Sequence, residues 1–115
     1  MTNARTNHQA TLAGTPATGG KVRGVAHVLG RELAMRPVEA GEILVVSALN
    51  YSVMPLAEVA AGVVTEVGGP LSHGATRMRE LAHPMVMAVP HAVDEITDGE
   101  VIEVDAAAGL VRHLN

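Results

Sequence analysis

His73 is the residue of this chain whose surroundings best suit group-transfer chemistry. It lies at the end of a glycine-rich stretch, Gly68-Gly69-Pro70-Leu71-Ser72-His73-Gly74. A neutral imidazole has an ordinary pKa of about 6.5, so it carries a free lone pair at neutral pH and can accept a phosphoryl group as a nucleophile. The spacing alone also fits a solvated surface histidine without chemical function.

A helix that begins at this histidine would place an anion site beside it. Ser72 is a favourable N-cap and the glycine pair permits a tight approach, so we expect a helix from Ser72 to Ala82. Helical spacing divides its residues into two arcs. The outward arc holds His73, Thr76, Arg77, Arg79 and Glu80, and the inward arc holds Ala75, Met78 and Leu81. The free N–H groups and the positive end of the helix dipole would favour an anion next to His73.

Two more side chains have two interpretations each. Arg77 lies one turn after His73, where it could reach a phosphate on the ring, or it pairs at the surface with Glu80. Thr65 precedes the glycine pair, and its hydroxyl either orients the imidazole or the phosphate, or bonds to backbone at a strand end. The sequence leaves both alternatives open.

The elements that must position His73 are short strands alternating with short helices. Apolar runs too short for helices predict strands at 43–48, 63–67 and 85–89, after a longer strand at 22–30 and a short strand and turn at 12–20. Proline can open a helix at 56–61 and must end the helix at 72–82. A helical turn at 92–96 and a hairpin at 100–104 and 110–113 complete the chain. This alternation predicts an α/β domain whose ligand position lies between a strand end and a helix start.

Length and composition limit the class of protein. The 115 residues suit a single compact domain over 12–115, preceded by a disordered tail at 1–11. Only Tyr51 is aromatic among Phe, Trp and Tyr, so the core must be aliphatic and methionine-rich. A net charge of −4 without a basic run argues against nucleic-acid binding. No apolar run approaches the roughly 20 residues that span a membrane, so we expect a cytoplasmic protein without membrane association.

Metal sites have little support in the sequence. The absence of cysteine excludes disulfides and thiolate metal ligands. The remaining histidines are scattered without the i, i+4 spacing of a paired helical site, at positions 8, 27, 83, 91 and 113. We therefore predict no metal ion bound by this chain.

A Gly-Gly-x-x-Ser-His-x-x-x-x-x-Arg spacing, followed by a proline and an apolar strand, is the most specific motif. Its residues are Gly68, Gly69, Ser72, His73, Arg79, Pro84 and the run 85–89. The motif resembles the signature of the phosphohistidine domain, also called swivelling or mobile, of enzymes that use phosphoenolpyruvate (PEP). That family includes pyruvate phosphate dikinase, PEP synthase, enzyme I of the sugar phosphotransferase system and rifampicin phosphotransferase. The resemblance covers nearly the whole chain after residue 12 and implies the swivelling β/β/α fold.

The resemblance also implies roles for individual residues. His73 would be the catalytic residue that accepts the phosphoryl group. The residues that would bind or orient the phosphate are Gly68, Gly69, Ser72, Gly74, Thr65, Arg77 and Arg79. The chain departs from the family pattern at Arg77, His83 and Ala106, which puts the partner and substrate in doubt rather than the fold.

In the resembling enzymes the mobile domain carries phosphate between an ATP-grasp nucleotide-binding domain and a domain that binds PEP, pyruvate or another acceptor. Neither fits into 115 residues. The resemblance therefore implies a carrier that needs partners, a component of a dikinase-type phosphotransferase and not a complete enzyme. This chain would bind no cofactor itself, and Mg²⁺ would arrive with ATP or PEP at the partner. The alternative is a non-catalytic binding or regulatory module that keeps the swivelling-domain fold.

Overall fold

The computed structural model describes residues 11–30, 37–69 and 72–114. The expected tail at 1–11 therefore lies almost wholly outside the described residues. Within them the elements are β1 (Leu12–Ala13), β2 (Thr15–Pro16), β3 (Lys21–Leu29), β4 (Ile43–Val46), α2 (Met54–Val59), β5 (Gly62–Thr65), α3 (His73–Leu81), β6 (Met85–Met87), α4 (Ala92–Glu95), β7 (Val101–Asp105) and β8 (Leu110–His113).

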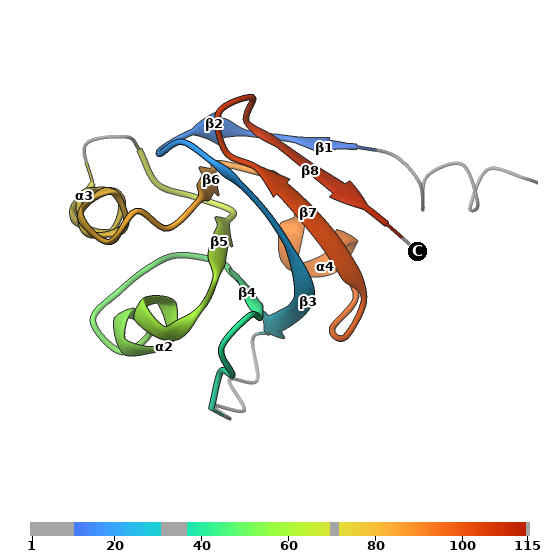
Figure 1. Ribbon diagram of the computed structural model, residues 1–115, viewed down its shortest axis with the longest axis horizontal. Coiled ribbons are helices and arrows are strands. Elements are labelled where there is room, and N and C mark those ends of the chain that lie inside the picture. The colour runs from blue at the N-terminus through green and yellow to red at the C-terminus, as the bar shows by residue number, and fades with distance from the viewer. Residues whose placement is uncertain (1–10, 31–36, 70–71, 115) are drawn as a thin grey trace, which may run out of the picture.

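One N-terminal segment borders both ends of the sheet. The strand order is β1-β8-β7-β3-β4-β5-β6-β2. β1 pairs antiparallel with β8, and β2 pairs antiparallel with β6. Because only Gly14 separates β1 from β2, the eight-stranded sheet is nearly closed into a barrel (Figure 1).

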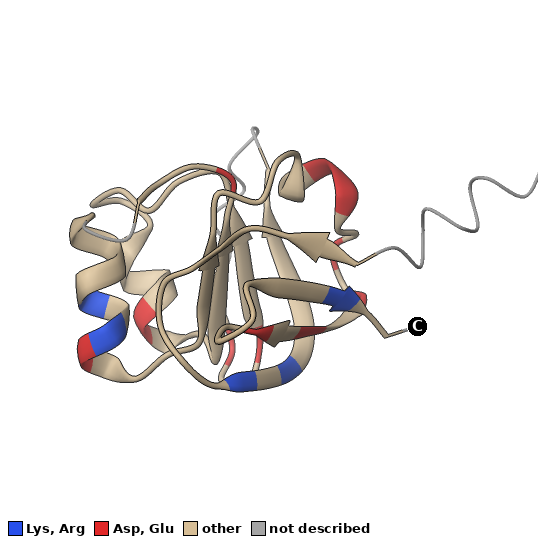
Figure 2. Ribbon diagram, turned by 90° about the horizontal axis from the view of Figure 1, so that it is seen from above, with Lys and Arg blue, Asp and Glu red and all other residues tan. Residues whose placement is uncertain are grey.

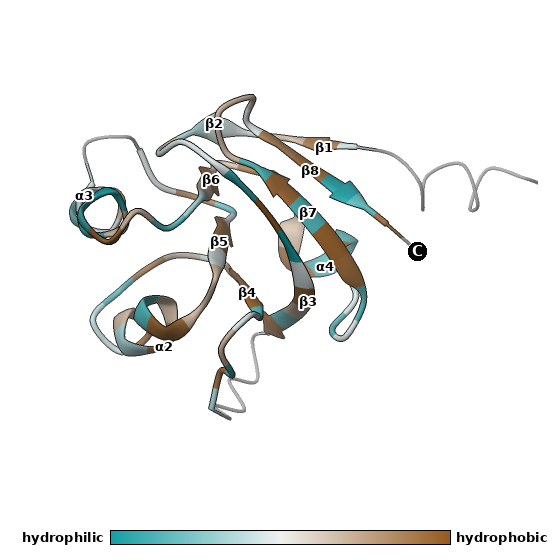
Figure 3. Cartoon of the chain, in the orientation of Figure 1, coloured by the Kyte–Doolittle hydropathy of each residue, from teal (hydrophilic) through white to brown (hydrophobic). Residues whose placement is uncertain are grey.

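The long strand β3 joins an antiparallel half to a parallel half. Its residues 21–25 pair antiparallel with β7, and its residues 26–29 pair parallel with β4. β4, β5 and β6 continue in parallel. Figure 3 shows β6 in brown throughout, whereas β3 and β7 alternate between brown and teal. Parallel strands covered on both faces have continuous apolar sequences, and half-exposed antiparallel strands alternate.

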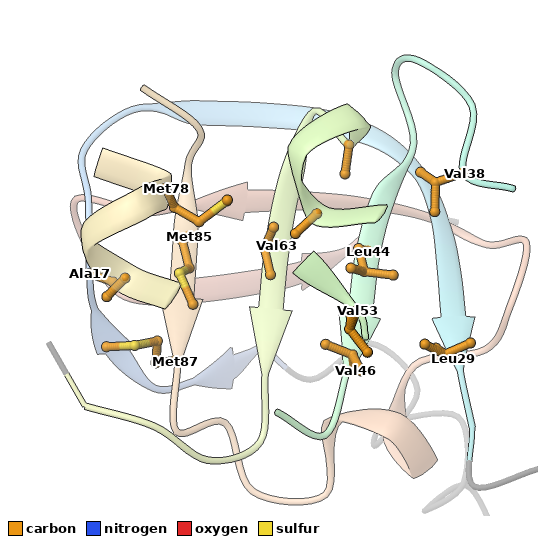
Figure 4. Packing of buried hydrophobic residues seen from close by; sticks show 13 residues of the cluster. Ala17, Leu29, Val38, Leu44, Val46, Val53, Val63, Met78, Met85 and Met87 are labelled. Atoms are coloured by element: carbon orange, nitrogen blue, oxygen red, sulfur yellow. The ribbon is translucent and has the colours of Figure 1, made fainter. Parts of the chain in front are cut away.

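The parallel strands contribute to two hydrophobic clusters, one on each face. The inner cluster, inside the barrel, includes Ile43, Val45, Val64, Val86 and Ile102. The outer cluster includes Leu44, Val46, Val63, Met85 and Met87. Helices α2 and α3 cover this outer face, and Figure 4 shows Met78 of α3 extending toward Met85. The core uses aliphatic and methionine side chains, as the composition predicts.

The α/β class, the single compact domain and the swivelling-domain fold are confirmed, with shorter strands than the hydrophobic runs suggested. β5 ends at Thr65 because the N–H groups of Glu66 and Val67 both donate to the carbonyl of Ser47, 3.1 Å away. β6 ends at Met87 because Ala88 has a left-handed φ of 57°. α2 begins at Met54, earlier than expected, and ends at Val59.

Substitution of Gly14 by alanine is expected to weaken the closure of the sheet. A Cβ at this position would lie 2.3 Å from the carbonyl oxygen of Met87 and 2.6 Å from Cγ2 of Val89. Gly14→Ala should lower the free energy of unfolding by about 1–3 kcal/mol, the usual cost of overpacking, as measured by chemical denaturation. Gly19→Ala is the matched control, because no described residue other than its chain neighbours lies within 4 Å of the added Cβ. Equal stability of the two variants would contradict the assigned closure.

Candidate functional site

His73 is the first residue of α3 and its side chain is exposed. Ser72 is the N-cap, with its Oγ accepting a hydrogen bond from the N–H of Ala75 at 3.2 Å. Gly74, Ala75 and Met78 are buried, while Thr76, Arg79 and Glu80 are exposed. The predicted helix, its N-cap and the outward direction of His73 are therefore confirmed.

The loops after β4 and β5 lie side by side at the carboxyl edge of the parallel strands. The N–H of Glu66 donates to the carbonyl of Val46 at 3.2 Å, and the N–H of Val67 donates to that of Ser47 at 3.1 Å. The loop after β5 leads to α3, so His73 lies at this edge. This is the edge at which ligands generally bind in open α/β sheets.

Two glycines of the motif meet different structural demands. Gly68 has a φ of +130°, a conformation that side chains rarely adopt. Gly74 lets α3 approach the loop after β4, because a Cβ there would lie 2.9 Å from Cδ1 of Leu49. Apart from its chain neighbours, no described residue lies within 4 Å of a Cβ added to Gly69. The motif therefore fixes the helix start against the neighbouring loop.

Some donors at the start of α3 have protein partners. The N–H of Ser72 donates to the carbonyl of Gly69 at 2.9 Å, and that of Thr76 donates to the carbonyl of Ser72 at 3.0 Å. The N–H groups of His73 and Gly74 donate to no acceptor among the residues that the structure describes. They stand at the positive end of the helix dipole, where an anion is favoured.

Thr65 is buried and its hydroxyl donates to the carbonyl oxygen of Val67 at 2.9 Å. Its own carbonyl accepts from the N–H of Val89 at 3.0 Å. Thr65 and His73, both described, share no hydrogen bond. The structure therefore places Thr65 in the strand-end arrangement, where it holds the turn toward Gly68.

Arg77 is turned toward α2. Its Nε donates to Glu58 at 3.0 Å and its guanidinium also pairs with Glu80 at 3.3 Å. The hydrogen bond to Glu58, and then that to Glu80, raises the pKa of the Arg77 guanidinium above its ordinary value. Figure 2 shows the basic bands of α3 beside an acidic band on α2. Surface pairing with Glu80 was one of the two expected arrangements, and the pair with Glu58 was not foreseen.

Arg79 is directed toward the N-terminal segment. Its guanidinium donates to the carbonyl oxygen of Ala17 at 3.0 Å and to the Thr76 hydroxyl at 3.4 Å. Neither Arg77 nor Arg79 makes a hydrogen bond to the His73 ring within the described parts of the chain. The structure thus brings the glycines, Ser72 and His73 together, and gives the arginines other partners.

The loop after β4 supplies neighbours of His73 that sequence reasoning missed. Tyr51 lies with its ring centroid 6.3 Å from that of His73, tilted by 48°. A hollow of about 220 Å³ lies between them, lined by Leu49, Asn50, Tyr51, Met54 and His73. The available signal was that Tyr51, the one Phe, Trp or Tyr residue of the sequence, lies between the strand expected at 43–48 and the helix expected at 56–61.

Other candidate chemistry does not gather at this site. The ring of His27 is buried and lies 3.0 Å from Glu42, and the ring of His113 lies 2.9 Å from Glu100. Across the described ranges, no group of three or more potential metal-ligating side chains comes together. None of the helices described there has the length and apolar character needed to cross a membrane.

Comparison with protein families decides the class of the chain. The family model of the PEP-utilising enzyme mobile domain matches residues 38–109, which include the motif, α2, α3 and β7. The chain belongs to this family. It is a mobile domain by sequence, and its fold agrees.

Similar proteins place this mobile domain inside much longer chains. It is 40% identical over 104 residues to a rifampicin phosphotransferase of Streptomyces sviceus, which covers 90% of this chain and 12% of the relative. It is 39% identical over 109 residues to a chondramide synthase of Chondromyces crocatus, covering 94% of this chain and 3% of that one. The chain therefore spans a small part of these curated relatives.

Solved structures share the fold over most of the mobile domain. Aconitase X of Thermococcus kodakaraensis has a TM-score of 0.72 at 21% identity, covering 92% of this chain and 99% of that chain. An enzyme I structure has a TM-score of 0.56 at 26% identity, covering 70% of this chain and 32% of that chain. The aconitase X comparison concerns the fold alone. It shows that this fold also forms nearly the whole of another solved chain.

The Arg77–Glu58 pair should contribute modestly to the stability of the mobile domain. Both side chains are 40% exposed, and exposed ion pairs contribute little to stability. A cycle with Glu58→Gln and Arg77→Gln, measured by denaturation, should give a small favourable coupling that shrinks in high salt. A cycle of Arg77→Gln with Glu39→Gln, whose carboxylate is not among the partners of Arg77, is the control. A Glu58 coupling no larger than the control would contradict the pair.

The end of α3 offers a stabilising substitution. Ala82 is exposed and has a left-handed φ of 59°, and the N–H of His83 donates to the carbonyl of Met78 as in a Schellman motif. Ala82→Gly should raise the free energy of unfolding by about 0.5–1 kcal/mol, because glycine adopts this conformation without strain. Ala107→Gly, also exposed but without a positive φ, should not be stabilising. Equal effects of the two substitutions would contradict the assigned strain.

Proposed function

We propose that this chain is a phosphohistidine carrier, in which His73 accepts a phosphoryl group from a partner that uses ATP or PEP and passes it to an acceptor. The observation that carries the proposal is the exposed imidazole at the capped start of α3, within the motif of the matched family. The described part of the site has an exposed nucleophile and backbone donors, but no complete set of groups for binding a nucleotide.

The transfer is an in-line displacement at phosphorus. A lone pair of the imidazole attacks, a P–N bond forms, and the P–O bond to the nucleotide or enolpyruvate leaving group breaks, with the leaving oxygen keeping the electron pair. A ring proton passes to solvent. Onward transfer reverses these roles, as an acceptor oxygen attacks phosphorus and the imidazole leaves.

The glycine loop and the helix start would stabilise the charge on phosphorylated His73. The group carries up to about two negative charges, which suit the N–H groups of His73 and Gly74 and the helix dipole. Gly68, Gly69 and Ser72 would shape this cradle. Arg77 and Arg79 would have to leave Glu58 and Ala17 to reach the phosphate, so we assign them a secondary role there.

Partners would supply what the described site lacks. The similarity to a rifampicin phosphotransferase, of which this chain covers 12%, supports transfer to an acceptor bound elsewhere. We infer that one partner is an ATP-grasp protein or domain that donates the phosphoryl group. The other partner would be a protein or domain that binds PEP or the acceptor. Mg²⁺ would arrive with the nucleotide or PEP at the partner. Within this scheme the chain is a component of a phosphotransferase that functions in the cytoplasm.

A second candidate is a non-catalytic binding or regulatory module on the same fold. The observation that favours it is the pairing of Arg77 and Arg79 with groups other than His73. The phosphorylation experiment separates the two candidates, because only a carrier becomes covalently loaded.

Intact-mass spectrometry at neutral or alkaline pH tests the carrier. After incubation with ATP-grasp partners and ATP, or with PEP-using partners and PEP, the wild type should gain one acid-labile phosphoryl group. His73→Ala should gain none. His91→Ala, which removes another exposed histidine, should load like the wild type. If no donor loads the wild type, while a partner enzyme functions equally well with His73→Ala, the binding module replaces the carrier.

A further inference from the structure

The only aromatic residue among Phe, Trp and Tyr lies outside the core and beside His73. Tyr51 is 87% exposed, although the chain is 48% hydrophobic and builds its core without Phe, Trp or Tyr. Replacing so exposed a side chain should change stability by no more than about 0.5 kcal/mol. Packing of the core therefore gives no reason for tyrosine at this position.

The backbone that carries Tyr51 is fixed on both sides. The N–H of Val53 donates to Oδ1 of Asn50 at 3.1 Å, and the N–H of Met54 donates to the carbonyl of Asn50 at 3.0 Å. On the other side, Leu49 packs closely over the backbone of Gly74, in the first turn of α3. The loop before α2 is therefore held against the helix that carries His73.

No residue that the structure describes gives the His73 ring the hydrogen bond that usually orients an imidazole. Its ring nitrogens bond to no group among the described residues, whereas other histidines have partners, such as Glu42 for His27. An exposed ring without such a bond can rotate, and rotation slows a reaction that needs one nitrogen aimed at phosphorus. The neighbour that can restrict it is the Tyr51 ring at 6.3 Å, within the 4.5–7 Å range of aromatic pairs.

We propose that Tyr51 is a positioning residue, which packs against the imidazole and leaves one of its two nitrogens exposed as the phosphorylated atom. The inference deepens the proposed function and rests on it. Tyr51 and His73 line the same hollow with Leu49, Asn50 and Met54, so the tyrosine ring borders the approach to the imidazole from that side. The residue acts through His73 and needs no contact with phosphorus.

Chemical phosphorylation with phosphoramidate tests this inference without a partner. An imidazole nitrogen attacks phosphorus, a P–N bond forms, the P–N bond to ammonia breaks with the electron pair going to ammonia, and the ring proton passes to solvent. Phosphorus NMR and peptide mapping then give the ratio of the two ring isomers at His73. His91, which is exposed and makes no ring contact with described residues, is the reference within the same molecule.

The wild type should give one predominant isomer at His73 and a less selective mixture at His91. Tyr51→Ala should lower the selectivity at His73 by a factor of about 2 to 10, the value of an aromatic pair, while Tyr51→Phe should keep it. Val59→Ala, an exposed apolar residue of α2, should leave it unchanged. All variants should unfold at the wild-type temperature.

Two results would overturn the inference. One is an isomer ratio in Tyr51→Ala equal to that of the wild type, and the other is loss of selectivity in Tyr51→Phe, which would assign the effect to the hydroxyl. Neither result affects the carrier proposal, because loading by ATP or PEP with a partner is measured separately. Conversely, His73 could give one predominant isomer with phosphoramidate in a chain that no partner loads. This result would support the role of Tyr51 in orienting the ring and contradict the proposed use of the ring in phosphoryl transfer.

Discussion

The close approach of the N-terminal segment to both edges of the sheet is the constraint on which the rest of the structure depends. Gly14 lies between β1, which pairs with β8, and β2, which pairs with β6. The backbone of Gly14 lies too near Met87 for a side chain to fit. The same segment reaches the helix that begins with His73, because the carbonyl of Ala17 accepts a hydrogen bond from Arg79. The Thr18 hydroxyl donates to the carbonyl of His83 and accepts from the N–H of Met85. Closure of the sheet and placement of α3 therefore share one set of contacts.

Burial of the parallel strands on both faces explains why the site is formed by loops and a helix end. The side chains of β4, β5 and β6 are used in the two hydrophobic clusters, so polar groups are available mainly where the strands stop. The loops after β4 and β5 are bonded to each other there, and α3 begins from the second loop. His73 is exposed for this reason, and this exposure is what the proposed carrier role would require.

The two arginines hold α3 in place, and their partners are separate from the groups around the His73 ring. Arg77 connects α3 to α2 through Glu58, and Arg79 connects α3 to the N-terminal segment. These contacts hold the helix whose first residue is His73. The ring neighbour found among the described residues is instead uncharged, namely Tyr51 at a centroid distance of 6.3 Å. In the proposed carrier, most of the positive charge needed for transfer would come from the partner.

The sequence by itself determined the strands, the helix of His73, its N-cap and its exposed face, because these follow from hydrophobic period, capping chemistry and proline placement over a few residues. It also determined the family, through a motif of fixed spacing. Only the tertiary structure decided which residues meet. The closure at Gly14, the pairing of Arg77 with Glu58, the Val67 partner of Thr65 and the approach of Tyr51 to His73 depend on how the loops and helices pack. Local propensity carries no information about such contacts, since Arg77 and Glu58 lie nineteen residues apart. Tyr51 lies in the loop after β4, whereas His73 begins the helix that follows the loop after β5.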